Sequence, residues 1–587
     1  ENKNGNAPSV EYTLDDGATW TTWDYTAINL TDGQKVRLRG SNPTGFSNPG
    51  NADFDRDKSP YSQFTTSGSG TLAASGYLMS LIDIHSATTA IPSQGCFSSL
   101  FSGCKNITTS PMLSATTLTD YCYMRLFMDC SKLTVAPELP VTTLAQNCYA
   151  AMFASCTALT QAPTLPATTL AVSCYNAMFS GCSNITQAPA LPATTLARSC
   201  YLGMFSVCSN LTQTPTLPAT TLAEYCYYNM FRGCSKLTQA PELPATTLAE
   251  SCYGGMFMNC TSLSEAPALP VTTLAEYCYG RMFEGCSSLT QAPALPATTL
   301  AQECYYGMFT GCFALTQAPA LPATTLAPGC YDGMFVNCHE LTQAPALPAT
   351  TLAKDCYNRM FMGCFALTQA PALPATTLTE SCYSGMFMNC TSLSEAPALP
   401  VTTLAEYCYA HMFERCTSLT QAPALPATTL ARGCYLSMFM NCTSLSEAPE
   451  LPATTLTQEC YSDMFNGCRT LNYVKVAFKR WDMPQGSTTN WLAGVASEGE
   501  FVCPEELQPK FGSSYIPERW TVKHNDEPEF ATGDVNGDGT VDVIDVNVLV
   551  SITLGNASAD GYNGRADVNG DGAVDVIDIN AILAIIL

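Results

Sequence analysis

Apolar residues along most of this chain recur with a fixed period, which the cysteines mark most clearly. From Cys96 to Cys468 the cysteines form fifteen pairs; the members of a pair are eight residues apart, and successive pairs are 26 residues apart. A constant period in this range is the sequence signature of a solenoid, in which stacked repeats share one continuous core. The pattern therefore predicts one long repeat array and not several globular domains.

One repeat, here called a rung, spans residues 237–262 and reads LTQAPELPATTLAESCYGGMFMNCTS. In its second half the apolar residues between Leu248 and Cys260 step by four, which is the spacing of one stripe on a helix. The two prolines of the first half remove backbone donors, so a strand there must be very short. We therefore predict an α/β repeat solenoid over residues 83–473, with about fifteen 26-residue rungs, each a short strand, a turn and a short helix.

Both ends of such an array expose edges that need to be covered. Residues 1–82 contain two stretches of alternating apolar residues, one around Asp16 and Gly17 and one around Asp32 and Gly33. Both patterns are typical of β-hairpins. We therefore predict an N-terminal β-rich cap domain, built as a small β-sandwich-like module.

The period also breaks at the other end of the array. Residues 474–524 hold three of the five tryptophans and Cys503, which falls outside the cysteine pairs. This composition suits a C-terminal solenoid cap of short strands. Residues 525–532 are polar and predict a linker to a last domain at 533–587.

The last domain contains two copies of one acidic loop, which begin at Asp534 and Asp567. Each copy has acids or amides at loop positions 1, 3, 5, 9 and 12, and Gly539 or Gly572 at position 6 for the sharp turn. Calcium prefers about six to eight hard oxygen ligands, which such a loop supplies together with one backbone carbonyl. Two intact copies argue against a degenerate turn, and we expect two Ca²⁺ ions. The predicted ligands are Asp534, Asn536, Asp538, Thr540 (carbonyl), Asp542 and Asp545, then Asp567, Asn569, Asp571, Ala573 (carbonyl), Asp575 and Asp578.

Two parts of the chain resemble known families. The segment MFMNCTSL, followed by APALP and a Thr-Thr-Leu turn, resembles the BspA-like leucine-rich repeats of Bacteroidales surface proteins over residues 86–473, although the unit here is longer. That resemblance implies a right-handed solenoid on the cell surface that serves adhesion or binding. The paired loops at 533–587 resemble a type I dockerin, an all-α calcium module, and imply a cohesin-like receptor as partner.

The dockerin-like module departs from its family at the partner-facing positions. Val543 and Ile544, and equally Val576 and Ile577, stand where a Ser-Thr pair is common, and the basic pair after the first loop is missing. The partner surface would then be apolar, or would lie in the same chain or a neighbouring copy. Folding of the module should depend on calcium, because clustered acidic ligands repel one another without it.

The charge and composition of the chain restrict the partners and the cellular location that we expect for it. The net charge is −24 and the isoelectric point about 4.4, which argues against a nucleic-acid partner. No run of 18 apolar residues exists, so we expect no membrane span. The polar first residues and the lack of a nearby cysteine suggest a mature form without a signal peptide or a lipoprotein anchor there. Together these features predict a secreted or bacterial cell-surface protein.

The paired cysteines allow two interpretations: fifteen disulfides, or columns of buried free thiols. Residues eight apart on a helix are about 12 Å apart, whereas a disulfide needs Cα atoms within about 7 Å, so we favour free thiols. The repeated Thr246 and Thr247 positions are interpreted as turn residues. The four histidines, His85, His339, His411 and His524, form no cluster, and Glu276 and Glu284 suit a solvated face.

No catalytic motif is present, so we predict a protein that is not an enzyme. The first hypothesis is adhesion: the solenoid binds a host or cell-surface protein or glycan, and the dockerin-like module attaches the chain through calcium. The alternative is a structural subunit that assembles head to tail into extracellular fibres through its C-terminal module. A scaffold for an enzyme partner is a third, weaker hypothesis.

Overall fold

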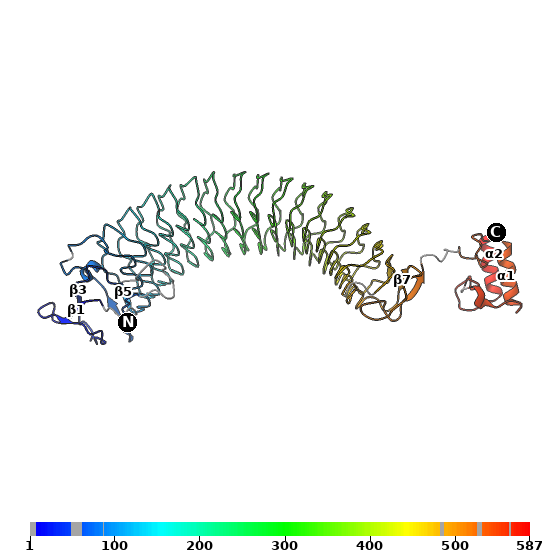
Figure 1. Ribbon diagram of the computed structural model, residues 1–587, viewed down its shortest axis with the longest axis horizontal. Helices are drawn as coiled ribbons and strands as arrows, with labels where there is room; N and C mark the ends of the chain where they lie inside the picture. The colour runs from blue at the N-terminus through cyan, green and yellow to red at the C-terminus, as the bar shows by residue number, and fades with distance from the viewer. Residues whose placement is uncertain (1–7, 48–60, 86, 482–485, 525–530, 563–564) are drawn as a thin grey trace.

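The computed structural model is a long arc of stacked rungs with a two-helix module at the C-terminal end of the chain (Figure 1). In the described part of the chain, neither helix has the length and apolar character needed to cross a membrane. The structure describes residues 8–47, 61–85, 87–481, 486–524, 531–562 and 565–587, so most of the predicted linker lies outside the described residues.

The N-terminal segment is one small antiparallel sheet in which β1 (Val10–Thr13) is the central strand. It pairs with β2 (Thr21–Thr22) through the turn at Asp16, as a hairpin requires, and with β3 (Arg37–Gly40) on its other side. The second expected hairpin is absent among the described residues, because β3 pairs with β1 and not with the residues just before Asp32. As far as its residues are described, the segment is therefore a single sheet and not a sandwich.

Parallel pairing begins where the chain enters the solenoid. The short strand β4 (Leu72–Ala73) pairs in parallel with β5 (Ile107–Thr109), and the 3₁₀ helix η1 (Leu78–Leu81) buries Leu78, Met79 and Leu81 beside them. Between β5 and the end of the array, the extended segments of successive rungs pair only through isolated bridges, such as that of Thr221 with Thr247. The prolines of each rung explain this sparse pairing, since they lack the donors that a continuous strand needs.

The predicted helix in each rung is wrong. Residues 249–260, here called the turn segment, form a succession of tight turns, in which Ser251, Gly255 and Asn259 have positive φ angles of 52°, 58° and 59°. An α-helix needs φ near −63° at every residue, so a left-handed residue at every fourth position excludes it. Positive φ angles recur at the equivalent positions of the other rungs. Each rung therefore consists of extended chain and turns.

Backbone hydrogen bonds in the turn segment alternate between two directions. The N–H of Cys252 donates to Ala249 within its own rung at 3.2 Å, whereas the N–H of Tyr253 donates to Cys278 of the next rung at 3.0 Å. Each second residue through Asn259 repeats the bond to the next rung. The turn segments are thus joined along the solenoid axis by a ladder of hydrogen bonds, which satisfies buried donors that a helix would have satisfied internally.

Two columns of aromatic rings fill the core beneath the turn segments. Tyr227 stacks on Tyr253 with ring centroids 5.7 Å apart, and Phe231 stacks on Phe257 at 5.8 Å. These rings are buried in every rung from Tyr123 to Phe465. Each offset pair adds about 0.5–1.5 kcal/mol beyond the burial of apolar area, so the stack stabilises the ladder at every step.

All 31 cysteines are buried free thiols. The second thiol of each pair donates to a backbone carbonyl of the preceding rung, as Cys260 does to Phe231 at 3.1 Å. Burial raises the pKa of these thiols, for example that of Cys148 and Cys260 to about 12. The thiols therefore serve as small packed residues and not as nucleophiles.

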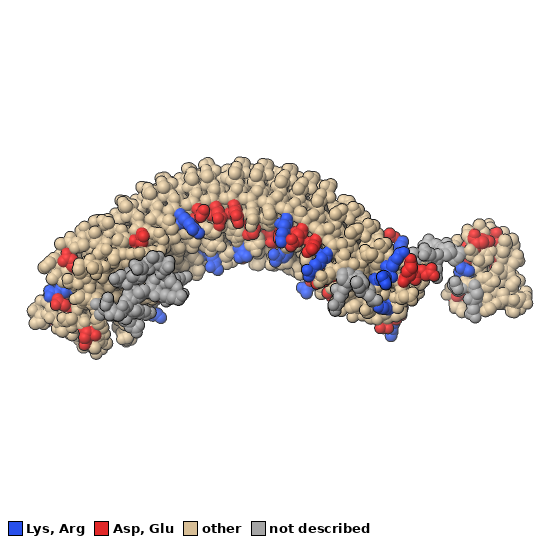
Figure 2. Space-filling view, viewed as in Figure 1, with Lys and Arg blue, Asp and Glu red and all other residues tan. Residues whose placement is uncertain are grey.

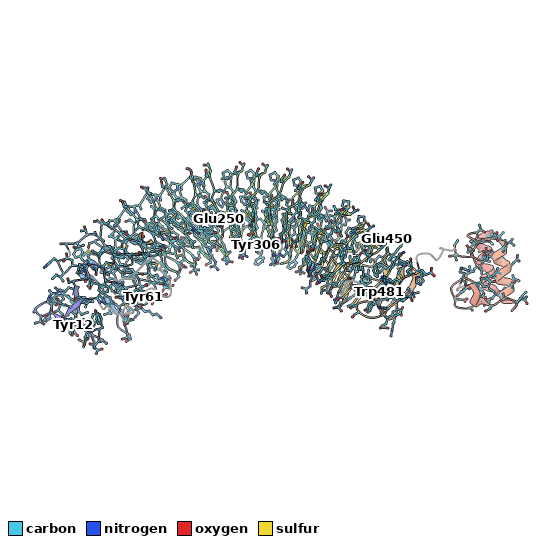
Figure 3. All side chains as sticks on the ribbon, viewed as in Figure 1. Tyr12, Tyr61, Glu250, Tyr306, Glu450 and Trp481 are labelled. Atoms are coloured by element: carbon cyan, nitrogen blue, oxygen red, sulfur yellow. The ribbon has the colours of Figure 1, made fainter. Side chains whose placement is uncertain are left out.

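The two sides of each rung explain the curvature of the arc. The proline segment, residues 239–247 in the reference rung, lies on the convex side, where Figure 3 places Glu450, whereas Tyr306 of a turn segment lies toward the concave side. Hydrogen bonds and stacked rings hold the turn segments close together. The proline segments lack most of these bonds, so they spread apart and the stack bends.

The C-terminal end of the solenoid is a three-stranded parallel sheet. Strand β6 (Tyr473–Lys475) pairs with β7 (Glu500–Cys503), which pairs with β8 (Thr521–His524). Tyr473 also bridges Glu447 of the last regular rung, so the sheet continues the parallel stacking of the array. Trp491 and Trp520 are buried beneath these strands and cover the end of the core.

The C-terminal module contains α1 (Val543–Thr553), the 3₁₀ helix η2 (Ala559–Tyr562) and α2 (Val576–Ile586). The two α-helices pack against each other around a separate small core. The fully or nearly buried members of this core are Val535, Leu549, Ile552, Ala566 and Ile582. Since this core does not include solenoid residues, the module has its own hydrophobic interior.

Candidate functional site

The first acidic loop folds around two buried carboxylates, Asp534 and Asp545. Asp534 accepts hydrogen bonds from the backbone N–H groups of Gly537 and Gly539, both at 2.8 Å. Asp545 accepts from Asn536 at 2.8 Å and from Asp542 at 3.0 Å. The backbone therefore fixes the first and last residues of the loop, with both carboxylates turned inward.

The second loop repeats this geometry. Asp567 accepts from Gly570 at 2.9 Å and Gly572 at 2.8 Å, and Asp578 accepts from Asn569 at 3.1 Å and from Asp575 at 2.9 Å. Equivalent hydrogen bonds in the two loops agree closely in length, so the sequence duplication is also a structural one.

Each loop leads directly into its helix through a capping box. Asp542 is the N-cap of α1 and accepts from Ile544, while Asp545 bonds back to the backbone of Asp542. Asp575 and Asp578 do the same for α2. Asp545 and Asp578 thus have two tasks, loop closure and helix capping, and the second one was not among the roles predicted from the sequence.

Four glycines give the loops their shape. Gly539 and Gly572, at the predicted turn position, have φ angles of 89° and 84°, and Gly537 and Gly570 have φ angles of 76° and 74°. A Cβ at Gly539, Gly570 or Gly572 would meet nothing within 4 Å. These positions therefore need glycine for its backbone conformation and not for space. The Asn-Gly-Asp-Gly spacing is the signal that points to the additional pair.

The donor set of each loop fits calcium. Carboxylate, amide and backbone carbonyl oxygens are the hard ligands that Ca²⁺ prefers, and residues 533–587 contain nine aspartates but a single basic residue, Arg565. Asp545 and Asp578 are fully buried, and a buried carboxylate is costly without a compensating charge. Among the described residues no three carboxylate, imidazole or thiol groups already converge as a metal site, because the loop carboxylates now accept from backbone N–H groups. Calcium would supply the counter-charge that these carboxylates need.

Apolar side chains beside both loops are exposed to solvent. Val543 and Ile544 at the start of α1 are 64% and 51% exposed, and Val576 and Ile577 at the start of α2 are 59% and 52% exposed. The two pairs occupy equivalent places in the duplicated halves. Exposed apolar pairs at equivalent places of a small module are typical of a protein-binding surface.

Two family models match the chain. The dockerin type I domain model matches residues 532–587, and the BspA type leucine rich repeat region matches residues 199–316, 330–445 and 354–480 in six copies. The chain contains BspA-type leucine-rich repeats and a C-terminal dockerin domain. Both modules are protein-interaction modules that are not catalytic in themselves, and type I dockerins bind calcium and cohesin-like partners.

Two further comparisons add little to this assignment. A search of curated proteins found no match. A solved structure described as "Crystal structure of TLR13-ssRNA13 complex" matches with 15% identity, over 62% of this chain and 48% of that one, and a TM-score of 0.21. The chain spans about half the length of that protein.

The leucine-rich repeats place their variable residues in the turn segments. Figure 2 shows that charged side chains gather along the concave half of the visible face, whereas the convex rim is almost uncharged. Glu276 and Glu284, predicted as solvated residues, belong to turn segments, and Glu284 pairs with Arg281 at 3.5 Å. The variable surface of the repeats is therefore concave and charged.

The histidines do not converge in the structure. His339 stacks between two aromatic rings of the neighbouring rungs, with centroid distances of 4.7 and 4.5 Å. His411 contacts Glu414 at 2.8 Å, and His524 lies 3.9 Å from the thiol of Cys503. Since burial raises the pKa of Cys503 to about 11, this last pair is not an activated nucleophile.

Proposed function

We propose that this chain is a secreted or cell-surface protein that binds a protein partner along its solenoid and is attached to a second protein through its calcium-loaded dockerin. The duplicated loops with their exposed apolar pairs are the main support. Each loop has a complete set of oxygen donors for one Ca²⁺, held by the same backbone hydrogen bonds. Two ions would therefore order both helix starts, where the apolar pairs stand.

The attachment surface in this proposal is apolar. Val543, Ile544, Val576 and Ile577 project from the first turns of α1 and α2. Burying four such side chains against a partner stabilises a complex by several kcal/mol, at about 25 cal/mol per Å² of apolar area. The complementary face of a cohesin-like partner would accordingly be apolar.

Calorimetric titration of the full chain with a panel of type I cohesins tests this proposal. We expect binding in calcium and none in excess chelator. Replacing all four apolar residues by Asp should abolish binding, whereas Val135→Asp, at a solenoid residue that is 59% exposed, should leave it unchanged. Binding that survives chelation, or survives the four substitutions, contradicts the proposal.

The alternative of head-to-tail fibres is tested with the same samples. In that case light scattering should show particles that grow with protein concentration when calcium is present and dissociate when it is removed. A chain that stays monodisperse under both conditions rules out fibre assembly through the dockerin. Growth in calcium without any cohesin binding would favour the fibre and not attachment to a foreign receptor.

A further inference from the structure

Four tyrosines gather in neighbouring turn segments of the solenoid. Tyr225 and Tyr228 lie in one rung with ring centroids 5.8 Å apart, and Tyr277 and Tyr306 lie two and three rungs further on, 5.9 Å from each other. All four are half-buried. Figure 3 places Tyr306 toward the concave edge of the arc. We call Tyr225, Tyr228, Tyr277 and Tyr306 the tyrosine patch.

Glycines beneath the rings hold the tyrosine patch in place. A Cβ at Gly254 would lie 2.7 Å from the ring of Tyr228, and a Cβ at Gly280 would lie 2.6 Å from the ring of Tyr277. Both rings therefore lie against backbone, and the lack of side chains at these two positions makes room for them. Rings that are fixed before a partner arrives lose little conformational entropy on binding, which favours affinity.

Carboxylates outnumber cations around the tyrosine patch. Arg198 pairs with Glu224 at 3.6 Å, so this guanidinium already has a counter-charge. Glu250 accepts a hydrogen bond from the hydroxyl of Tyr225. Within the described part of the chain, no ion pair involves Glu250, Glu276 or Glu303. The patch consequently has an excess of negative charge, on a chain whose net charge is −24.

The tyrosines of this surface already bind guanidinium groups within the molecule. Arg281 lies over the ring of Tyr306 at 5.1 Å and donates to its hydroxyl at 3.3 Å. Arg198 lies over the ring of Tyr225 at 5.8 Å. Among the described residues no cation lies over Tyr228 or Tyr277, although a cation over a tyrosine face contributes about 0.5–2 kcal/mol. Each of these two half-buried rings therefore lies against a glycine on one side and has no cation of the described residues on the other.

We propose that the tyrosine patch, together with Glu250, Glu276 and Glu303, is a docking site for a basic segment of a partner protein. Lysine or arginine side chains of that segment lie over Tyr228 and Tyr277 and pair with the three carboxylates. Tyrosine and arginine are also the residues enriched at binding hot spots. This inference rests on the proposed role of the solenoid in binding protein, and it assigns that role to four rungs near the middle of the arc.

Fluorescence anisotropy of a labelled nona-arginine peptide with the full chain in calcium tests the site. The variant Glu250→Gln/Glu276→Gln removes two charges from the patch. Glu242→Gln/Glu265→Gln removes the same two charges from exposed positions in and beside the proline segments, and serves as the matched control. At physiological salt we expect the patch variant to weaken binding about tenfold and the control variant less than twofold. Equal effects of both variants would mean unspecific attraction to an acidic chain and would overturn the proposal.

A second variant separates the aromatic rings from the charges. Tyr228→Leu/Tyr277→Leu keeps apolar bulk and net charge but removes both π faces, and we expect it to weaken peptide binding about fivefold with an unchanged thermal midpoint. The proposal would be overturned if this variant kept its full affinity for the peptide, or if the unmodified chain did not bind the peptide. It would also be overturned if the two tyrosines were needed only for binding neutral oligosaccharides, which would indicate a glycan site. Cohesin binding to the same variants should stay intact, so a failure of the patch can be told from a failure of the dockerin.

Discussion

The ring of Tyr123 stacks on the ring of Tyr149 in the next rung, with centroids 5.9 Å apart and planes 10° from parallel. Both rings are buried in the same column, yet their hydroxyl groups differ. The hydroxyl oxygen of Tyr123 is a buried polar atom without a hydrogen-bond partner among the described residues, whereas that of Tyr149 is not. Tyr123, near the N-terminal end of the stack, therefore has a fully buried hydroxyl that lacks a hydrogen-bond partner, unlike its neighbour.

Tyr123→Phe should stabilise the solenoid by about 1 kcal/mol, because the substitution removes a buried donor that makes no hydrogen bond. Urea unfolding followed by tyrosine fluorescence measures the change. Tyr149→Phe is the matched control and should change the free energy of unfolding much less. A loss of stability in Tyr123→Phe would mean that its hydroxyl has a partner after all.

Val207→Asn should also stabilise the solenoid, by about 1 kcal/mol. Val207 has a φ of 60°, which is strained for a β-branched residue, and it is 52% exposed, so little burial is lost. Asparagine tolerates this conformation, and Asn259 occupies the equivalent position with a φ of 59°. Thermal unfolding checks the prediction. Val172→Asn, at a similarly exposed valine without a positive φ, should give no gain.

The buried thiols predict unfolding of the solenoid at alkaline pH. Burial raises the pKa of Cys148 and Cys260 from 9.0 to about 12, and the other paired cysteines shift in the same direction. Above pH 9 the unfolded chain releases thiol protons that the folded chain retains, so stability is complete below pH 9 and falls as pH rises toward 12. Near-ultraviolet circular dichroism from pH 8 to 11.5 should show a steep loss of aromatic signal. The C-terminal module has no cysteine, so its helical signal at 222 nm is the internal control and should persist to higher pH.

Asp545→Asn should halve calcium binding. Asp545 is fully buried and closes the first loop, and its equivalent Asp578 closes the second loop in the same way. Isothermal titration of the full chain should therefore fall from two ions to one, and the double variant with Asp578→Asn should bind none. Asn547→Ala, on the exposed face of α1, is the control and should retain both ions. Two ions bound by Asp545→Asn would show that this carboxylate is not a ligand.

The sequence predicted the parts of the fold that depend on local or strictly repeated signals. The period of the cysteines indicated the solenoid, and the Asp-Val-Asn-Gly-Asp-Gly spacing indicated two loops whose closing residues, Asp545 and Asp578, the structure turns inward. The match to a dockerin and to BspA-type repeats confirms the suspected families. Whether each predicted ligand binds calcium stays a prediction for titration to decide.

The helix was the error, and one signal in the sequence could have prevented it. Ser251, Gly255 and Asn259 are four residues apart, and other rungs also favour glycine, asparagine or serine at these positions. Such residues are poor in helices but tolerate positive φ, whereas the apolar stripe at the same spacing was taken as helical. The tyrosine patch was beyond prediction, because Tyr277 and Tyr306 come from variable positions of different rungs and meet only through the register of the stack.

The concave side of the arc has more hydrogen bonds between rungs than the convex side, so the two sides resist stretching differently. On the concave side, hydrogen bonds such as that from Tyr253 to Cys278 lie along the axis and resist stretching. On the convex side, the proline segments leave shallow grooves between rungs, such as the one lined by Pro215 and Pro241. Pulling the two ends apart would straighten the arc by closing these grooves before any hydrogen bond breaks. A chain tethered at its dockerin and pulled at its other end would thus extend elastically by straightening, and would absorb small displacements without unfolding.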